Sequence, residues 1–246
     1  MTYCVGMTLN RGLIFMSDTR TNAGVDNVST FRKMTLWEVP GQMSLTLLSS
    51  GNLATTQAVI SQLEERSKAR GERDPDILSA PSMFQAAQIV AETLRDVVSK
   101  HANSGMTSSS SFKATLILGG QIAGGPPRLF LIYPEGNFIE TSEDTPFLQV
   151  GETKYGKPIL VRAYDPDLDF SQAMRLLLVS FDSTVKANLS VAPPFDYHFY
   201  ETDSLCSGEC GRIQPDDPYY ALISEAWGKA LKSALNSLPD YPGGRD

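Results

Sequence analysis

The sequence predicts an α+β protein made of two antiparallel sheets with helices packed on their outer faces. Three features indicate this fold class. The first fifty residues contain four strand-like segments with no helix between them, which favours antiparallel pairing. Helical spacing follows in the middle of the chain, and the second half again runs from strands to helices. No internal repeat and no domain boundary occur, so residues 1–246 are expected to form a single domain.

The opening strands are predicted from period-two alternation and from turn residues. Segment 3–9 alternates large and small side chains, and the turn at 10–12 leads into a second strand at 13–16, which predicts a hairpin. A third strand is predicted over 33–39, where Pro-Gly ends it, and a fourth over 43–49.

Apolar residues at steps of three and four predict a helix over 52–70 and a second helix, capped by Ser82, that continues to residue 98. Segments 71–81 and 103–111 are expected to be polar connections. The second half is predicted to contain strands at 113–118, 128–133, 147–150 and 195–201, with helices at 170–189 and 218–238.

Composition and charge exclude several classes of function. The chain has 21 Lys and Arg against 28 Asp and Glu, a net charge of −7, so no basic face for nucleic acid is expected. It lacks an apolar run of about 18 residues and a secretory signal, so no membrane association is expected. Three cysteines are too few for a disulfide framework. We therefore expect a cytoplasmic protein.

Thr2 is the first candidate for chemistry, because removal of Met1 would make it the N-terminal residue. A threonine hydroxyl is a weak nucleophile until a base takes its proton, and a free N-terminal amine can be that base. The pKa of such an amine, roughly 7.7–8.0, leaves an appreciable neutral fraction near pH 7. A Met-Thr start is also common in proteins without this chemistry, so the hypothesis needs support from other residues.

Three further residues are predicted to lie near Thr2. Asp18 ends the second strand of the hairpin, which returns to the start of the first, although an aspartate that caps a turn would fit there too. Lys33 begins the third strand and can reach the same end of the sheet, although such a lysine is usually solvated. Gly51 leads from the fourth strand into the first helix, whose N–H groups suit an anion. An ordinary strand-to-helix turn would have the same sequence.

Four residues in their sequence contexts together resemble the pattern of the proteasome-type N-terminal-nucleophile hydrolases. They are Thr2, Asp18 in SDTR, Lys33, and Gly51 in SGNLATTQAV. The resemblance covers the whole chain in element order. It is closest to the bacterial ancestral β-subunit group, Anbu, through MTYCVG, RTNAGVDNVSTFRKM and the absence of a propeptide. It implies a four-layer αββα sandwich in which Thr2 is the nucleophile, Asp18 and Lys33 assist it, and Gly51 belongs to the oxyanion hole.

The chain departs from the β-subunit pattern at the positions that support the nucleophile. Glu152 stands where that pattern has a serine, and Ser190 is the nearest match to the serine of a later Asp-x-x-Ser-Gly segment. The family position of Thr21 and Asn22 implies that they contact the substrate backbone. The core of Thr2, Asp18 and Lys33 matches the pattern, while the residues that support it differ.

The resemblance implies hydrolysis of peptide bonds through an acyl ester on Thr2, with neither a metal nor an organic cofactor. It also implies a peptide or protein substrate and self-association into ring-like or open helical particles. Two alternatives stay open. One is an amidase for a non-peptide or modified-peptide substrate on the same fold, and the other is a peptide-binding assembly subunit with little turnover.

Other arrangements of reactive residues have less support. Cys206 and Cys210 with His198 make a poor tetrahedral metal set, and a loop with free cysteines is expected instead. Cys4 alternates within a strand and is predicted to be a small core residue. With only two histidines in the chain, a Ser-His-Asp triad is not expected.

Overall fold

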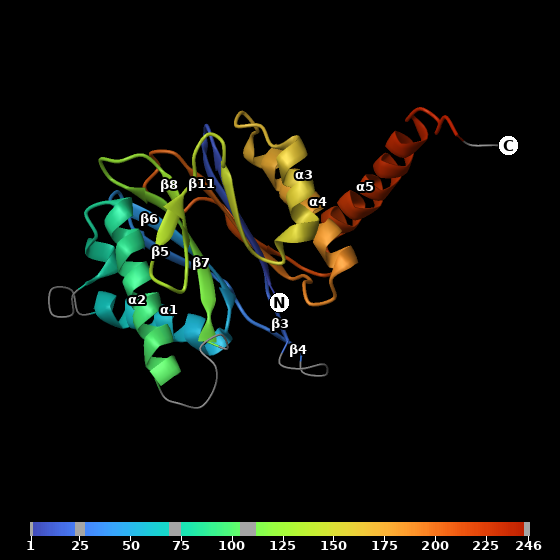
Figure 1. The fold of residues 1–246 in the computed structure, drawn as a ribbon. Coiled ribbons are helices and arrows are strands. Elements are labelled where there is room, and N and C mark those ends of the chain that lie inside the picture. Colours follow the sequence, from blue (N-terminus) through green and yellow to red (C-terminus); the bar gives the residue numbers. More distant parts are fainter. Residues whose placement is uncertain (1, 23–27, 69–74, 104–111, 244–246) are drawn as a thin grey trace.

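The computed structural model describes residues 2–22, 28–68, 75–103 and 112–243. Within these residues, two five-stranded antiparallel sheets face each other, and helices cover the outer face of each sheet (Figure 1). The predicted four-layer αββα sandwich is confirmed.

The first sheet has the strand order β10-β1-β2-β11-β12. Its strands are β1 (Tyr3–Leu9), β2 (Gly12–Asp18), β10 (Phe147–Gly151), β11 (Phe195–Glu201) and β12 (Cys210–Ile213). Cys4 pairs with Ser17 across the hairpin, and Tyr3 pairs with Gly151 on the other side of β1. The start of β1 therefore lies between the end of β2 and the end of β10.

The second sheet has the order β5-β6-β7-β8-β9. Its strands are β5 (Met34–Val39), β6 (Met43–Gly51), β7 (Ala114–Ile122), β8 (Arg128–Ile132) and β9 (Phe138–Glu140). A separate short hairpin consists of β3 (Arg20–Asn22) and β4 (Val28–Thr30). This hairpin connects the two sheets, since β2 precedes it and β5 follows it.

The second sheet is covered by α1 (Leu53–Lys68) and α2 (Met83–Asn103), and the first by α3 (Thr153–Ala163), α4 (Phe170–Ala187) and the start of α5 (Pro218–Asn236). Ser82 caps α2 as predicted, because its Oγ accepts a hydrogen bond from the Gln85 N–H at 3.3 Å. Asn52 caps α1 in the same way, through the Thr55 N–H at 3.0 Å.

Three apolar layers separate the four layers of secondary structure. Tyr3, Val5 and Met7 on one face of β1 pack toward α4, whereas Cys4 on the other face packs between the sheets. Cys4 is thus a core residue, as predicted. Burial raises the pKa of its thiol, which keeps the sulfur protonated near neutral pH.

Several short elements were absent from the sequence-based prediction. These are the strands β3, β4, β9 and β12, helix α3, and a 3₁₀-helix, Ile77–Ser79, in the expected connection 71–81. The four strands have three or four residues each, too few for a clear alternation. The predicted connection 103–111 lies largely outside the described residues.

Helix α3 was missed because Gly156 and Pro158 both weaken a helical pattern. Packing overrides this local preference. Leu160 is fully buried on the inner face of α3, and a Cβ on Gly156 would lie 2.2 Å from the Tyr3 hydroxyl oxygen. The glycine therefore allows α3 to approach β1 closely, at the cost of local helix propensity.

Candidate active site

Thr2 lies where the ends of β1, β2 and β10 meet. It is 6% exposed, and its carbonyl oxygen accepts a hydrogen bond from the Glu152 N–H at 2.7 Å. Gly151 has φ +86°, and a Cβ there would lie 1.9 Å from the Thr2 carbonyl oxygen. Only glycine lets β10 turn so closely past Thr2. The predicted removal of Met1 concerns a residue outside those described, so it stays a prediction.

Asp18 and Lys33 form a buried ion pair next to the start of β1. Lys33 Nζ donates to Asp18 Oδ1 at 2.7 Å and to the Arg20 carbonyl at 2.6 Å. Asp18 Oδ1 also accepts from the Tyr3 N–H at 3.0 Å, which places the carboxylate beside the residue that follows Thr2. Burial raises the pKa of Asp18, while the Lys33 ammonium and the Tyr3 N–H oppose that rise. The contacts hold the Lys33 ammonium in one place.

A cavity of about 470 Å³ opens beside Thr2. Five residues predicted for the site line it, namely Thr2, Thr21, Lys33, Gly51 and Glu152. The remaining lining residues are Arg20, Ser49, Ser50, Leu53, Thr56, Gly151 and Lys154. Asp18 does not line the cavity but accepts a hydrogen bond from Lys33, which does. Ser190 does not line the cavity either. Asn22 lies in β3, but its predicted contact concerns a side chain outside the described part of the structure.

Gly51 ends β6 in a conformation that other residues rarely adopt. Its φ is +114°, and a Cβ there would lie 2.5 Å from the Lys113 carbonyl oxygen. Two residues later α1 begins at Leu53, which also lines the cavity. The N-terminus of a helix carries partial positive charge, so this wall of the cavity suits an anion or a developing oxyanion.

Glu152 presents a buried carboxylate to the cavity. It is the N-cap residue of α3, yet its side chain makes no capping hydrogen bond. Instead, Glu152 Oε2 accepts from the Asn188 amide at 2.6 Å, and Asn188 Oδ1 accepts from the Ser190 N–H at 2.9 Å. Glu152 is 8% exposed, and none of the ion pairs in the described part of the chain includes it. Ser190 thus supports Glu152 indirectly, through its backbone.

Residues that the sequence analysis did not single out complete the site. Asn188 holds the Glu152 carboxylate, and Arg20 supplies the carbonyl that accepts from Lys33. The Arg20 guanidinium donates to the Leu189 carbonyl at 2.7 Å. The contacts of Asn188 with Glu152 and of Arg20 with Leu189 join segments 36 and 169 positions apart, so no local pattern could indicate them. The cavity has three cations, Arg20, Lys33 and Lys154, and one carboxylate among its lining residues.

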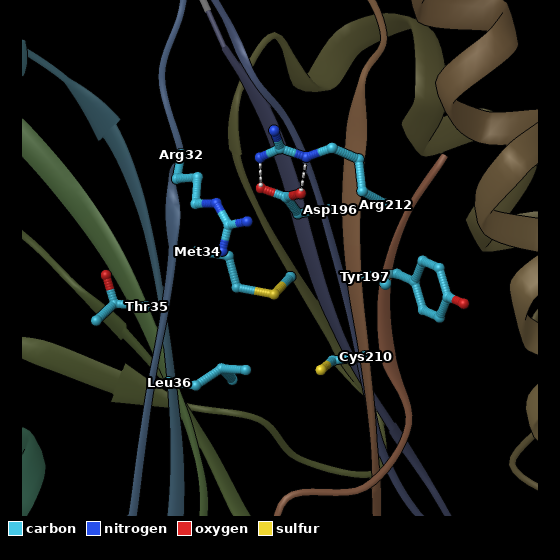
Figure 2. A pocket seen from close by; sticks show the side chains of 9 residues that line it. Arg32, Met34, Thr35, Leu36, Asp196, Tyr197, Cys210 and Arg212 are labelled. Atoms are coloured by element: carbon cyan, nitrogen blue, oxygen red, sulfur yellow. Dashed lines mark hydrogen bonds and ion pairs between the residues drawn. The ribbon is translucent and has the colours of Figure 1, made fainter. Parts of the chain in front are cut away.

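Of the cysteines and the histidine considered as a metal set, His198 and Cys210 are partners across β11 and β12, but the three do not form a cluster of metal ligands. Cys206 and Cys210 are exposed free thiols, while His198 is fully buried between the sheets and contacts Thr46 Oγ at 2.8 Å through Nδ1. Cys210 lines a separate cavity between β5 and β12, which shares no lining residue with the cavity at Thr2 (Figure 2). Among the described residues, no three potential metal ligands cluster, and no helix is long and apolar enough to cross a membrane.

The sandwich is a proteasome β-subunit-like fold, and the chain is a proteasome-related subunit. Solved structures of Anbu proteins are similar to it over almost their full length. The helical assembly of the Anbu complex from Pseudomonas aeruginosa is 46% identical, with a TM-score of 0.92 and 100% of both chains covered. Anbu from Yersinia bercovieri is 46% identical, with a TM-score of 0.90 and coverage of 98% of this chain and 99% of that one.

A Gly-1 mutant of Anbu from Hyphomicrobium sp. strain MC1 is 45% identical, with a TM-score of 0.91 and coverage of 98% of this chain and 99% of that one. The chain belongs to the Anbu (ancestral β-subunit) family. The resemblance inferred from its sequence is therefore confirmed. No family model and no curated protein matches the chain.

Proposed function

We propose that this chain is a threonine peptidase subunit that hydrolyses peptide bonds through an acyl ester on Thr2. The observation that carries the proposal is the shared cavity of Thr2 and Lys33, in which Asp18 and the Arg20 carbonyl hold the lysine ammonium. A positive charge at this position favours the deprotonated form of a nearby hydroxyl. Family membership supports a proteasome-related hydrolase.

In the proposed mechanism, Thr2 Oγ attacks the carbonyl carbon of the substrate, and the α-amino group of Thr2 accepts the hydroxyl proton. A C–O bond forms and the peptide C–N bond breaks, with that proton leaving on the departing amine. The Gly51 N–H stabilises the oxyanion, a contribution of roughly 2.7–4 kcal/mol for one such donor. Water then attacks the ester, which releases the carboxylic acid product and regenerates Thr2.

The short strand β3 is the proposed docking edge for the substrate backbone. It pairs with β4 on one side, and its residue Thr21 lines the cavity. An extended peptide can add as a strand to an exposed edge and gain main-chain hydrogen bonds. Thr21 and Asn22 would then contact the substrate backbone while its scissile carbonyl lies at Thr2.

We also propose that the chain self-associates in the cytoplasm. A relative that is 46% identical over the full length is described as a helical assembly. A ring closes only if the rotation between neighbouring subunits returns to its start, and otherwise the same contact makes an open helix. Free cysteines suit a reducing compartment.

The Glu152 carboxylate favours a second candidate function, a peptide-binding subunit with little turnover. A carboxylate near the Thr2 α-amino group would favour the charged ammonium form, which cannot accept a proton. In that case the cavity binds peptide but its base is largely protonated near pH 7. The amidase alternative uses the same machinery and differs in substrate alone.

Labelling with an electrophilic peptide tests the proposed nucleophile. We expect one adduct per chain on Thr2, in molecules whose N-terminal mass shows that Met1 is absent. Because exposed thiols also react with electrophiles, the experiment uses a Cys206→Ser/Cys210→Ser chain, with and without Thr2→Ala. Loss of the adduct in the Thr2→Ala chain supports the proposal. Full labelling or turnover in that chain, or in chains that retain Met1, would refute it.

A further inference from the structure

The charges of the cavity at Thr2 do not balance. Its charged lining residues are Arg20, Lys33, Glu152 and Lys154. The Lys33 ammonium has its own counter-charge, because it forms an ion pair with Asp18 at 2.7 Å. The Glu152 carboxylate shares the cavity with the α-amino group that the proposed mechanism uses as its base. Two positive charges, those of Arg20 and Lys154, are then left over.

Arg20 and Lys154 belong to one wall of the cavity. The Arg20 guanidinium donates to the Leu189 carbonyl, a neutral acceptor, at 2.7 Å. Leu189 follows Asn188, whose amide holds the Glu152 carboxylate, and Lys154 lies two residues after Glu152 on α3. No ion pair in the described part of the chain includes either cation. This wall therefore presents two cations that lack a carboxylate partner.

Lys154 is unfavourable for the helix that carries it. Helix α3 begins at Thr153, so Lys154 lies in its first turn, where the partial positive charge of the helix N-terminus repels a cation. The carboxylate of the N-cap residue, Glu152, accepts from Asn188 and forms no ion pair with Lys154. The Lys154 side chain is also exposed, so packing does not offset the repulsion. An anion that enters the cavity would compensate both the helix end and the lysine.

The proposed mechanism determines which part of a substrate meets this wall. The acyl part pairs with β3 at Thr21, and the leaving amine takes its proton from the α-amino group of Thr2. Thr2 adjoins the start of α3, because its carbonyl oxygen accepts from the Glu152 N–H at 2.7 Å. The substrate chain beyond the scissile bond therefore leaves Thr2 past Glu152 and Lys154.

We propose that Lys154, assisted by Arg20, selects substrates whose leaving group carries a carboxylate in its first residue. An acidic side chain and a free chain terminus both supply this chemistry. The inference rests on the proposed peptidase function and names the substrate class of that function. Lys154 is a specificity-determining residue, because it acts on the bound leaving group and not on the reacting atoms.

Three matched peptides test the preference and identify the source of the carboxylate. All share the acyl part of a peptide that the chain cleaves, and each ends in a single residue after the scissile bond. That residue is a glutamine amide, a glutamate amide, or a glutamine with a free terminal carboxylate. We expect one or both acidic forms to be cleaved with a kcat/KM about threefold to fivefold above that of the glutamine amide, as for an exposed ion pair.

Variants of α3 test the residue. Lys154→Gln should lose the preference for the acidic forms, whereas Lys154→Arg should keep it. Lys157→Gln is the matched control and should keep the full preference, because Lys157 is also exposed, lies three residues further along α3 and lines a different cavity. Labelling of Thr2 verifies that each variant retains a reactive nucleophile, and circular dichroism verifies that each is folded.

The outcomes separate this inference from the proposed function. A chain that cleaves none of the peptides would overturn the proposed peptidase function together with this inference. A chain that cleaves them without preference for the acidic forms would overturn the inference alone. The same holds if the preference survives Lys154→Gln or is lost in Lys157→Gln.

Discussion

Lys33 owes its position to oxygens from two segments of the chain. Asp18 ends β2, the Arg20 carbonyl belongs to β3, and both lie within 2.7 Å of the lysine nitrogen. The pair is almost completely buried, so each charge depends on the other for compensation. The same contact thus contributes to stability and to the proposed chemistry.

Removal of either charge should therefore reduce labelling of Thr2 and stability together. We expect Asp18→Asn and Lys33→Ala each to lose most of the labelling rate and about 3 kcal/mol or more of unfolding free energy. Because the two residues act as a unit, the double variant should lose little more than either single variant. Rates of adduct formation and urea unfolding measure both effects. If the fold loss in rate of the double variant equals the product of the two single losses, the two residues act independently and this prediction is wrong.

Glu152 should set the pH range of the proposed activity. Thr2 and Glu152 line the same cavity, and a carboxylate favours the charged form of an amine that it faces, so removal of the Glu152 charge should increase the neutral fraction of the amine near pH 7. Glu152→Gln keeps an oxygen that can accept from Asn188 and removes the charge. We expect the acid limb of the labelling rate against pH to move down by about one pH unit. A limb that does not move would show that Glu152 does not act on the amine.

At the scale of elements, α3 and α5 use glycine for opposite reasons. Gly156 lets α3 approach the Tyr3 hydroxyl and Ser180 Oγ, where an added Cβ would be 2.2 and 2.4 Å away. Gly228 in α5 has open space around it. The first glycine serves packing within the chain, and the second is free of that demand.

Alanine at these two positions should therefore shift stability in opposite directions. Gly156→Ala is expected to cost about 1–3 kcal/mol, because the added methyl overpacks the contact with β1. Gly228→Ala should add about 0.5–1 kcal/mol through helix propensity. Urea unfolding of each variant against the parent chain measures both. If both substitutions change the free energy of unfolding in the same direction, this account of α3 is wrong.

At the scale of the whole molecule, His198 links the two sheets across the sandwich. It lies on β11 and contacts Thr46 on β6, while its Nε2 has no hydrogen-bond partner within the described residues. Burial lowers the pKa of His198 to about 4, although the Glu38 carboxylate opposes that shift. Protonation would place an uncompensated charge between the sheets.

This histidine should make the fold less stable in acid. Its folded pKa lies below the unfolded value of 6.5, so as pH falls from 6.5 toward 4 the unfolded chain takes up the proton first. The expected loss from this group is about 2 kcal/mol between pH 7 and pH 5. His198→Phe/Thr46→Val replaces the pair by apolar groups and should remove that part of the slope. An unchanged slope in urea unfolding would exclude His198 as its source.

The amino-acid sequence by itself determined the layers and the order of the long elements. Periodicity and turn residues, which act locally along the chain, predicted the strands β1, β2, β6 and β11 and the helices α1, α2, α4 and α5. The hairpin also predicted that Asp18 returns to the start of β1, since strand length alone dictates that approach. Local information was insufficient for α3, whose proline and glycine oppose a helix that packing then imposes.

Only the tertiary structure decided which groups complete the cavity at Thr2. Asn188 contacts Glu152 across 36 positions of sequence, and the Arg20 carbonyl contacts Lys33 because the hairpin of β3 and β4 brings Thr30 back beside Arg20. Such contacts depend on where whole elements dock, and docking is driven by burial summed over many residues, a quantity that no short window of sequence contains. The same holds for α5, where the sequence shows Leu231 and Leu235 four positions apart but only the fold shows that both are exposed, beyond the part of the helix that packs in the core.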